Sequence, residues 1–175
     1  MAPSQMDRIW APWRMAYIEA HSGSSECLFC ELPGSDDNLI LHRGVEAYVV
    51  LNRYPYSNGH LMVVPYAHQA SIEDLDDSTL LEVMTLSSQA ISVLRATYAA
   101  EAFNLGVNIG KAAGAGVVHH VHMHVLPRWA GDTNFMATTA GTRVIPEDLE
   151  ETLARLVSHW DSPPAEEDSD SGRQV

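Results

Sequence analysis

Cysteine is almost absent from this chain of 175 residues, in which Cys27 and Cys30 are the only two. Two cysteines are too few for the disulfide framework of a small secreted protein. The sequence also has no apolar run long enough to span a membrane, and residues 1–7 lack the charged and then apolar pattern of a signal peptide. We therefore expect a cytoplasmic protein that has no membrane partner.

Positive charge is scarce as well, because 10 lysines and arginines stand against 23 acidic residues and the net charge is -13. A general nucleic-acid binder neutralises phosphates with many lysines and arginines, so we expect no nucleic-acid polymer as a partner. A ligand that carries phosphate would have to be held locally, by backbone amides or by a few side chains. The length fits about one domain.

Histidine, in contrast, is concentrated in one stretch, since four of the nine histidines lie within residues 119–124. His120, His122 and His124 alternate with apolar residues at the period of a β-strand, which predicts three imidazoles on one face of a sheet. Two kinds of site fit this pattern. Three imidazoles can hold a metal ion in a catalytic zinc site, or one imidazole can act as a nucleophile beside its helpers.

Cys27 and Cys30 form a C-x-x-C pair, which can be a redox dithiol, half of a zinc site or two thiols without a special role. A redox pair should open a helix in a β-α-β pattern, whereas Pro33 and Gly34 break the chain soon after the pair. We therefore favour zinc. Because no other cysteine exists, the two remaining ligands would be histidines.

Apolar periodicity predicts the elements around these residues. The expected strands and helices lie at residues 48–51, 61–64, 77–100, 103–109 and from 146–148 onward. In the long helix of residues 77–100, Thr79 and Glu82 suggest a capping box near the start, and Met84 is expected in the core. This helix is interpreted as scaffold.

Two predicted loops carry candidate ligand contacts. Asn52 and His60 stand at the strand ends of loop 52–60, where they could reach a ligand or be plain turn residues. Residues 110–116 form a loop of small residues, and glycine lets backbone amides approach an anion. Beside three histidines in register, this loop is a plausible phosphate cradle.

Three segments are expected along the chain. They are an aromatic arm at residues 1–20 with Trp10 and Trp13, a folded domain at residues 21–160, and an acidic disordered tail at residues 161–175. The arm would pack in the core or dock on the domain or a partner subunit.

The histidine stretch resembles a known motif. Residues 120–126, His-Val-His-Met-His-Val-Leu, are similar to the histidine triad (HIT) signature His-φ-His-φ-His-φ-φ, in which φ is apolar. Residues 51–53, 58–60 and Asn108 fit the same superfamily. Residues 10–14, 52–56 and 127–135 most resemble its branch of bacterial diadenosine tetraphosphate phosphorylases and hydrolases. The resemblance implies an α+β fold with a HIT-like antiparallel sheet, one long central helix and one C-terminal helix, assembled as a homodimer.

The resemblance also implies roles for single residues. His122 would attack the α-phosphorus of a nucleotide or dinucleoside polyphosphate and form a nucleotidyl-histidine, and His124 would contact phosphate and assist the leaving group. Asn52 would hold the ribose and Asn108 the phosphate region, while His60 orients the site. The backbone amides of the small-residue loop would stabilise the transferring phosphoryl group, at Gly114, Ala115 and Gly116.

His120 has a second implied role. In relatives with a similar C-x-x-C, the first triad histidine joins a structural zinc, which implies the ligands Cys27, Cys30, His68 and His120. Turnover would then require no catalytic metal at the triad. His119 is an alternative ligand, but its neighbouring position should point it to the opposite face.

One departure from the family pattern bears on substrate choice. Many members carry Gly-Gln-Ser or Gly-Gln-Thr before the triad, where this chain has Ala115, Gly116 and Val117. The missing hydroxyl leaves open whether water or phosphate is the second nucleophile. The alternatives are a nucleoside phosphoramidase or adenylyl hydrolase, an enzyme with a catalytic metal on the three histidines, and a non-catalytic nucleotide-binding dimer module.

Overall fold

The computed structural model describes residues 27–35, 39–132 and 147–160. The aromatic arm and the acidic tail expected at the two ends of the chain lie outside the described residues. Within these ranges, no helix combines the length and the apolar character that crossing a membrane requires.

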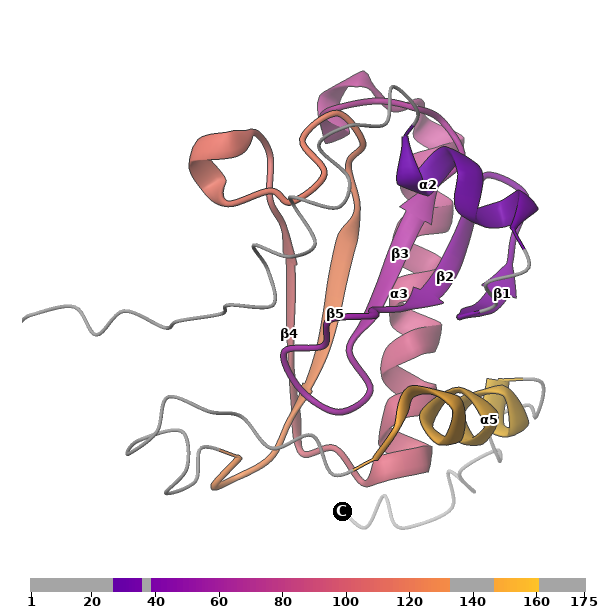
Figure 1. The fold of residues 1–175 in the computed structure, drawn as a ribbon, viewed down its shortest axis with the longest axis vertical. Helices are drawn as coiled ribbons and strands as arrows, with labels where there is room; N and C mark the ends of the chain where they lie inside the picture. The colour runs from indigo at the N-terminus through magenta and orange to yellow at the C-terminus, as the bar shows by residue number, and fades with distance from the viewer. Residues whose placement is uncertain (1–26, 36–38, 133–146, 161–175) are drawn as a thin grey trace, which may run out of the picture.

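The described part of the chain is an α+β domain built on one five-stranded antiparallel sheet (Figure 1). The strands are β1 (Ile40–Arg43), β2 (Ala47–Leu51), β3 (Leu61–Pro65), β4 (Ala102–Val107) and β5 (Met123–Arg128), in the spatial order β1-β2-β3-β5-β4. The helices and helical turns are α2 (Leu28–Glu31), η1 (Leu32–Gly34), η2 (Ile72–Asp74), α3 (Asp77–Tyr98), η3 (Lys111–Ala113) and α5 (Leu149–Trp160). The predicted fold class, with a long central helix and a C-terminal helix, is confirmed.

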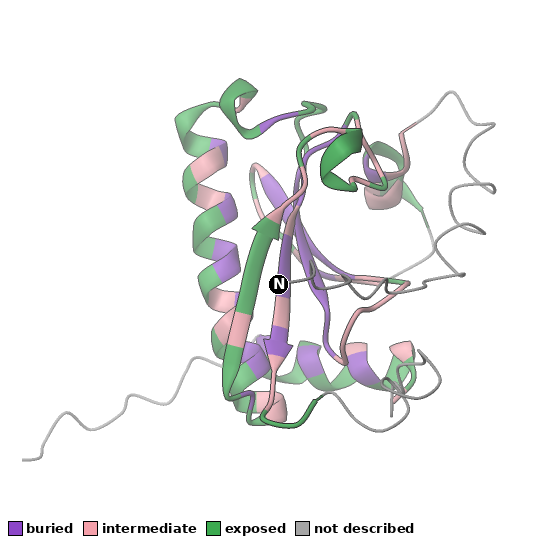
Figure 2. Cartoon of the chain, turned by 90° about the vertical axis from the view of Figure 1, so that its left-hand side faces the viewer, coloured by how far each residue is buried: buried purple, intermediate pink, exposed green. Residues whose placement is uncertain are grey.

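Strands β2 and β3 are buried along their whole length (Figure 2). Because successive side chains point to opposite faces, this pair contributes to two apolar clusters. Val49 and Val63 face the larger cluster beneath α3, while Tyr48 and Val64 face a smaller one that contains Phe29 of α2. The sheet is therefore covered by α3 on one face, and the opposite face receives α2.

Helix α3 begins at Asp77 as predicted, but the capping box of Thr79 and Glu82 is wrong. The N-cap is Asp76, whose side chain accepts a 2.8 Å hydrogen bond from the Thr79 backbone N–H. Met84 also departs from the prediction, since it is 53% exposed rather than in the core.

Glu82 serves a different purpose from capping. Its carboxylate accepts hydrogen bonds from three successive backbone N–H groups where the chain turns from β1 into β2, those of Val45, Glu46 and Ala47. Burial alone would raise the pKa of Glu82, but these hydrogen bonds lower it overall. A capping box would have offered the Glu82 carboxylate one backbone N–H at the helix start, whereas the turn from β1 into β2 offers three. The side chain therefore connects α3 to the β1–β2 hairpin.

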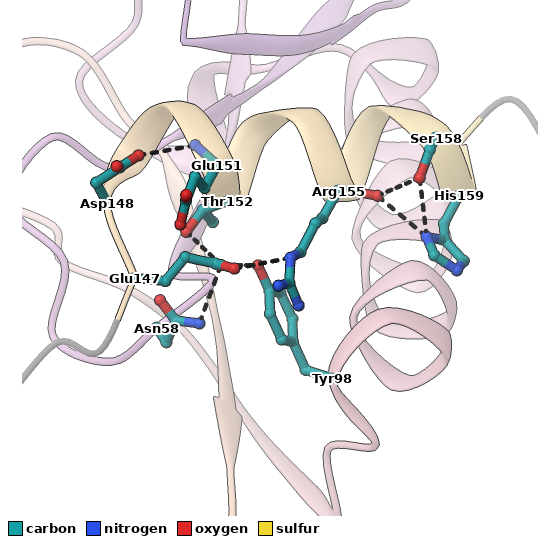
Figure 3. A network of polar contacts seen from close by, with 9 residues as sticks. All are labelled: Asn58, Tyr98, Glu147, Asp148, Glu151, Thr152, Arg155, Ser158 and His159. Atoms are coloured by element: carbon teal, nitrogen blue, oxygen red, sulfur yellow. Dashed lines mark hydrogen bonds and ion pairs between the residues drawn. The ribbon is translucent and has the colours of Figure 1, made fainter.

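Helix α5 packs against α3 and β1, and Glu147, two residues before its start, joins three segments (Figure 3). Its carboxylate accepts hydrogen bonds from Tyr98 Oη at 2.5 Å, Thr152 Oγ1 at 2.8 Å and Asn58 Nδ2 at 3.5 Å. It also forms a 2.8 Å ion pair with Arg155 Nε. Asn58 belongs to the loop that carries Asn52 and His60, so α5 is connected to a predicted site loop.

Candidate active site and metal cluster

The histidine stretch enters the sheet later than predicted. Strand β5 begins at Met123, so His124 lies in the strand, whereas His120 and His122 lie in the segment directly before it. The reason is that the Val121 N–H donates to the Gln69 carbonyl at 2.7 Å, outside the sheet. The rings nevertheless lie close together, because the centroids of His122 and His124 are 4.8 Å apart and the ring of Phe29 contacts both His120 and His122.

The ring of His122 has a defined tautomer. Its Nδ1 lies 3.0 Å from the His120 carbonyl oxygen, which can only accept, so Nδ1 carries the proton. Burial lowers the pKa of His122, against a smaller opposing effect of this hydrogen bond. The neutral ring therefore places its lone pair on Nε2, as a nucleophile requires.

The ring of His124 has the opposite tautomer, which is set through His60. The Tyr56 backbone N–H donates to Nδ1 of His60 at 3.1 Å, and the Asn52 amide nitrogen lies 3.2 Å from the same atom. Burial lowers the pKa of His60 well below its ordinary value, and neighbouring His124 and His122 lower it further. Neutral His60 is thus protonated at Nε2, which donates to Nδ1 of His124 at 2.9 Å. His124 consequently carries its proton on Nε2.

Two adjacent rings therefore have complementary chemistry. The centroids of His122 and His124 are 4.8 Å apart in an edge-on arrangement. One ring offers a lone pair at Nε2, and the other carries a proton at Nε2. This arrangement can attack an electrophile and protonate a group that leaves it.

The loop between β2 and β3 is closed by its own hydrogen bonds. The Asn52 N–H donates to the His60 carbonyl at 2.9 Å, and the Asn52 side-chain oxygen accepts from the Tyr54 N–H at 3.0 Å. Gly59 has φ +72°, and a Cβ there would lie 2.8 Å from the Leu94 side chain of α3. Asn52 and His60 are thus held rigidly in a loop packed on the scaffold helix.

The residues predicted to contact phosphate follow strand β4 along the chain. Asn108 follows the last residue of β4, one step beyond the registered pair of Val107 and Met123, and is half-buried. In the small-residue loop, Gly110 and Gly114 have positive φ values of 80° and 86°. Val117 packs against the cluster around Phe29. Because residue 117 is a valine, this position offers no hydroxyl group to a ligand.

The structure brings together the four predicted metal ligands, Cys27, Cys30, His68 and His120, with their ligand atoms within 4.8 Å of one another. Nδ1 of His120 lies 3.3 Å from Cys27 Sγ and 3.5 Å from Cys30 Sγ, and Nδ1 of His68 lies 3.2 Å from Cys30 Sγ. Neighbouring sulfur and nitrogen ligands of a tetrahedral zinc are about 3.6 Å apart. The donor set therefore fits zinc.

A second contact orients His120 toward this cluster. Its Nε2 donates to the Pro65 carbonyl at 2.8 Å, which leaves the lone pair of Nδ1 facing the thiols. His119 is exposed and lies outside the cluster. The first triad histidine thus points to the metal cluster, while its backbone carbonyl orients His122.

Two functional neighbours escaped the sequence analysis. Tyr56 contributes a backbone N–H, which any residue except proline provides, so no side-chain pattern reveals it. Phe29 packs on the rings of His120 and His122. A phenylalanine between two cysteines is also typical of ordinary core packing. The residue type of Phe29 therefore does not by itself predict contact with the histidine rings.

Comparisons with known proteins agree with this geometry. A family model described as HIT domain matches residues 35–131, more than half of the chain. The AP-4-A phosphorylase of Mycobacterium tuberculosis is 39% identical over 166 residues, which cover 89% of this chain and 85% of the relative.

Two solved structures share the fold. A Zn-bound histidine triad family protein from Mycobacterium smegmatis superimposes with a TM-score of 0.66 at 28% identity, over 79% of this chain and 95% of that one. A hypothetical histidine triad nucleotide-binding protein from Sulfolobus tokodaii gives 0.64 at 25% identity, over 77% and 91%. The chain therefore belongs to the HIT family of nucleotide hydrolases and nucleotidyltransferases.

Proposed function

We propose that this protein cleaves dinucleoside polyphosphates such as diadenosine tetraphosphate, as a phosphorylase or a hydrolase, through a nucleotidyl-histidine on His122. The observation that carries the proposal is the pair of complementary tautomers, with a lone pair on Nε2 of His122 and a proton on Nε2 of His124. The similarity to the mycobacterial AP-4-A phosphorylase supports this substrate class.

The first step is attack of His122 Nε2 on the α-phosphorus. A phosphorus–nitrogen bond forms as the bond to the bridging oxygen breaks, and His124 Nε2–H gives its proton to that oxygen of the departing nucleotide. In the second step, phosphate or water attacks the same phosphorus, the phosphorus–nitrogen bond to His122 breaks, and the attacking group gives a proton to His124. With diadenosine tetraphosphate the first step releases ATP, and the second yields ADP with phosphate or AMP with water.

Charge on the transferring group needs stabilisation from the chain itself. We assign this role to the amides of Gly114, Ala115 and Gly116 and to Asn108, with Asn52 at the ribose. Val117 packs in an apolar cluster, so backbone amides act here without a hydroxyl group.

The metal cluster has a structural role in this proposal. Zinc on Cys27, Cys30, His68 and His120 would fix α2 and the entry to β5. The reaction at His122 needs no catalytic metal. Thiolate ligands suit a reducing compartment such as the cytoplasm.

We also propose a homodimer joined through β4. This strand is one edge of the sheet, and the exposed fractions of Leu105 on it and Ile109 just beyond it are 41% and 42%. The other edge strand, β1, packs against α5. Pairing of β4 with β4 of a second copy would give hydrogen-bond partners to the backbone groups at this edge of the sheet and would cover the two side chains.

Product analysis tests the activity. Wild type, His122→Ala and His119→Ala are incubated with diadenosine tetraphosphate, with and without inorganic phosphate, and in parallel with adenosine phosphoramidate. Phosphate-dependent ATP and ADP, retained in His119→Ala and lost in His122→Ala, identify a phosphorylase, and ATP and AMP without phosphate identify a hydrolase. If only adenosine phosphoramidate is cleaved, the result would favour the phosphoramidase alternative. If neither compound is cleaved, the result would favour a non-catalytic binding module.

A further inference from the structure

Phe29 is the buried side chain of α2 and lies between the two cysteines of the metal cluster. It is 3% exposed. Its ring centroid is 5.5 Å from that of His120, edge-on at 72°, and 4.8 Å from that of His122, tilted at 52°. An apolar ring carried by the metal-binding turn thus lies directly on the proposed nucleophile.

Helix α2 cannot maintain this position by itself. A four-residue helix is below the length at which hydrogen bonds repay the cost of nucleation, and Cys27 at its N-cap makes no side-chain capping bond. Two ties hold the turn in place. The Phe29 carbonyl accepts a 2.8 Å hydrogen bond from the buried hydroxyl of Tyr48, and the flanking thiols of Cys27 and Cys30 belong to the metal cluster.

The orientation of His122 depends on such contacts. Its hydrogen bond to the His120 carbonyl sets which nitrogen is protonated, but one bond leaves the ring able to tilt about it. The rings of His124 and Phe29, each with its centroid 4.8 Å away, restrict that tilt. Direct attack requires the reacting atoms to be aligned at about 3–3.5 Å.

We propose that Phe29 is a positioning residue for the His122 ring, and that Cys27 and Cys30 serve catalysis by holding Phe29 in place. This inference rests on the proposed function, because it takes His122 as the nucleophile. Loss of the ring contact slows formation of the phosphorus–nitrogen bond and leaves the affinity for substrate unchanged.

The test compares Phe29→Leu with Val50→Ala in the full-length, zinc-loaded protein. Leucine keeps an apolar side chain and removes the ring, whereas Val50→Ala removes volume from the same apolar cluster on β2. We expect Phe29→Leu to retain zinc, to lower kcat about 10- to 100-fold and to leave KM unchanged. The ring-proton NMR resonances of His122 should shift, because the contribution of the Phe29 ring current is lost. Val50→Ala should be less stable with kcat and these resonances unchanged.

Metal removal gives a second readout. Chelation of the wild type should shift the His122 resonances in the same direction as Phe29→Leu, and chelation of Phe29→Leu should add little, because both act through one contact. The inference would be overturned if Phe29→Leu left both kcat and the His122 resonances unchanged. It would also be overturned if the shifts caused by chelation and by Phe29→Leu were fully additive. If the wild type lacks turnover altogether, the proposed function fails, and the resonances still decide how His122 is held.

Discussion

The backbone amide of Tyr56 governs the protonation of two imidazoles, because His60 passes its effect on to His124. His124 is therefore expected to act as a proton donor to the leaving group, and His124→Ala tests that role. Turnover of diadenosine tetraphosphate should fall about 10²- to 10⁴-fold. Turnover of the p-nitrophenyl ester of AMP should fall far less, since p-nitrophenolate leaves without a proton. Equal losses on the two substrates would contradict the assignment, and His122→Ala should abolish both reactions.

Buried His60 also predicts a pH dependence of stability. Its pKa is lowered in the folded protein, and His122, His124 and Tyr56 are the titratable groups around it. In the unfolded chain it binds a proton near pH 6.5, so folding is disfavoured as the pH falls below that value. The resulting loss in the free energy of unfolding is up to about 1.4 kcal/mol for each pH unit below 6.5, and it is absent above pH 7.

Urea unfolding of wild type and His60→Gln at pH 5 and pH 7.5 measures this contribution. The free energy of unfolding should fall less between the two values in the variant than in the wild type. An identical fall in both proteins would show that His60 is not the group responsible.

At the scale of elements, Glu147 links α5 to α3 and to the site loop through Tyr98 and Asn58 (Figure 3). Glu147→Gln removes the charge that pairs with Arg155 and leaves these donors a weaker acceptor. We expect a loss of about 1–3 kcal/mol in the free energy of unfolding, measured with urea. The matched control is Glu150→Gln, an exposed acidic residue in the first turn of the same helix. A loss of the same size in both variants would contradict this role.

The sequence predicted elements better than it predicted their polar contacts. Helix α3 and the central strands were found within two residues of their bounds because their apolar patterns are long or continuous. Strand β1 was missed because four residues, Ile40–Arg43, are too short to show a period. The role of Glu82 was wrong because its three backbone donors lie 35 to 37 residues away in sequence.

In the candidate site too, the residues could be predicted from the sequence, whereas the hydrogen bonds between them could not. Alternation alone grouped His120, His122 and His124, and the four metal ligands were recovered from the family resemblance. The hydrogen bond between His60 and His124 spans 64 residues, so no local pattern could give it. The tautomers that follow from it required the three-dimensional structure.

For the molecule as a whole, the metal is expected to contribute to stability without taking part in the reaction. Chelation should lower the melting temperature, and either zinc or cadmium should restore it, since both ions accept tetrahedral thiolate ligands. The kcat of the cadmium-loaded protein should stay within about twofold of the zinc-loaded one, because the ion does not contact the reacting phosphate. A large change in kcat between the two metals would favour a catalytic metal.

The proposed dimer is tested at the same scale. Leu105→Lys places a charge on the exposed edge strand β4 and should shift the protein toward the monomer in analytical ultracentrifugation. Leu81→Lys is the control, because Leu81 is 70% exposed on α3, away from the sheet edge. A monomeric wild type, or equal behaviour of the two variants, would contradict the proposed interface.

The double use of His120 has a practical consequence. Its side chain belongs to the metal cluster, while its carbonyl, a few bonds away, fixes the ring of His122. A preparation expressed under zinc limitation would then contain folded copies with a lower kcat alongside fully active ones. Kinetic comparisons between preparations should accordingly be made at equal metal content.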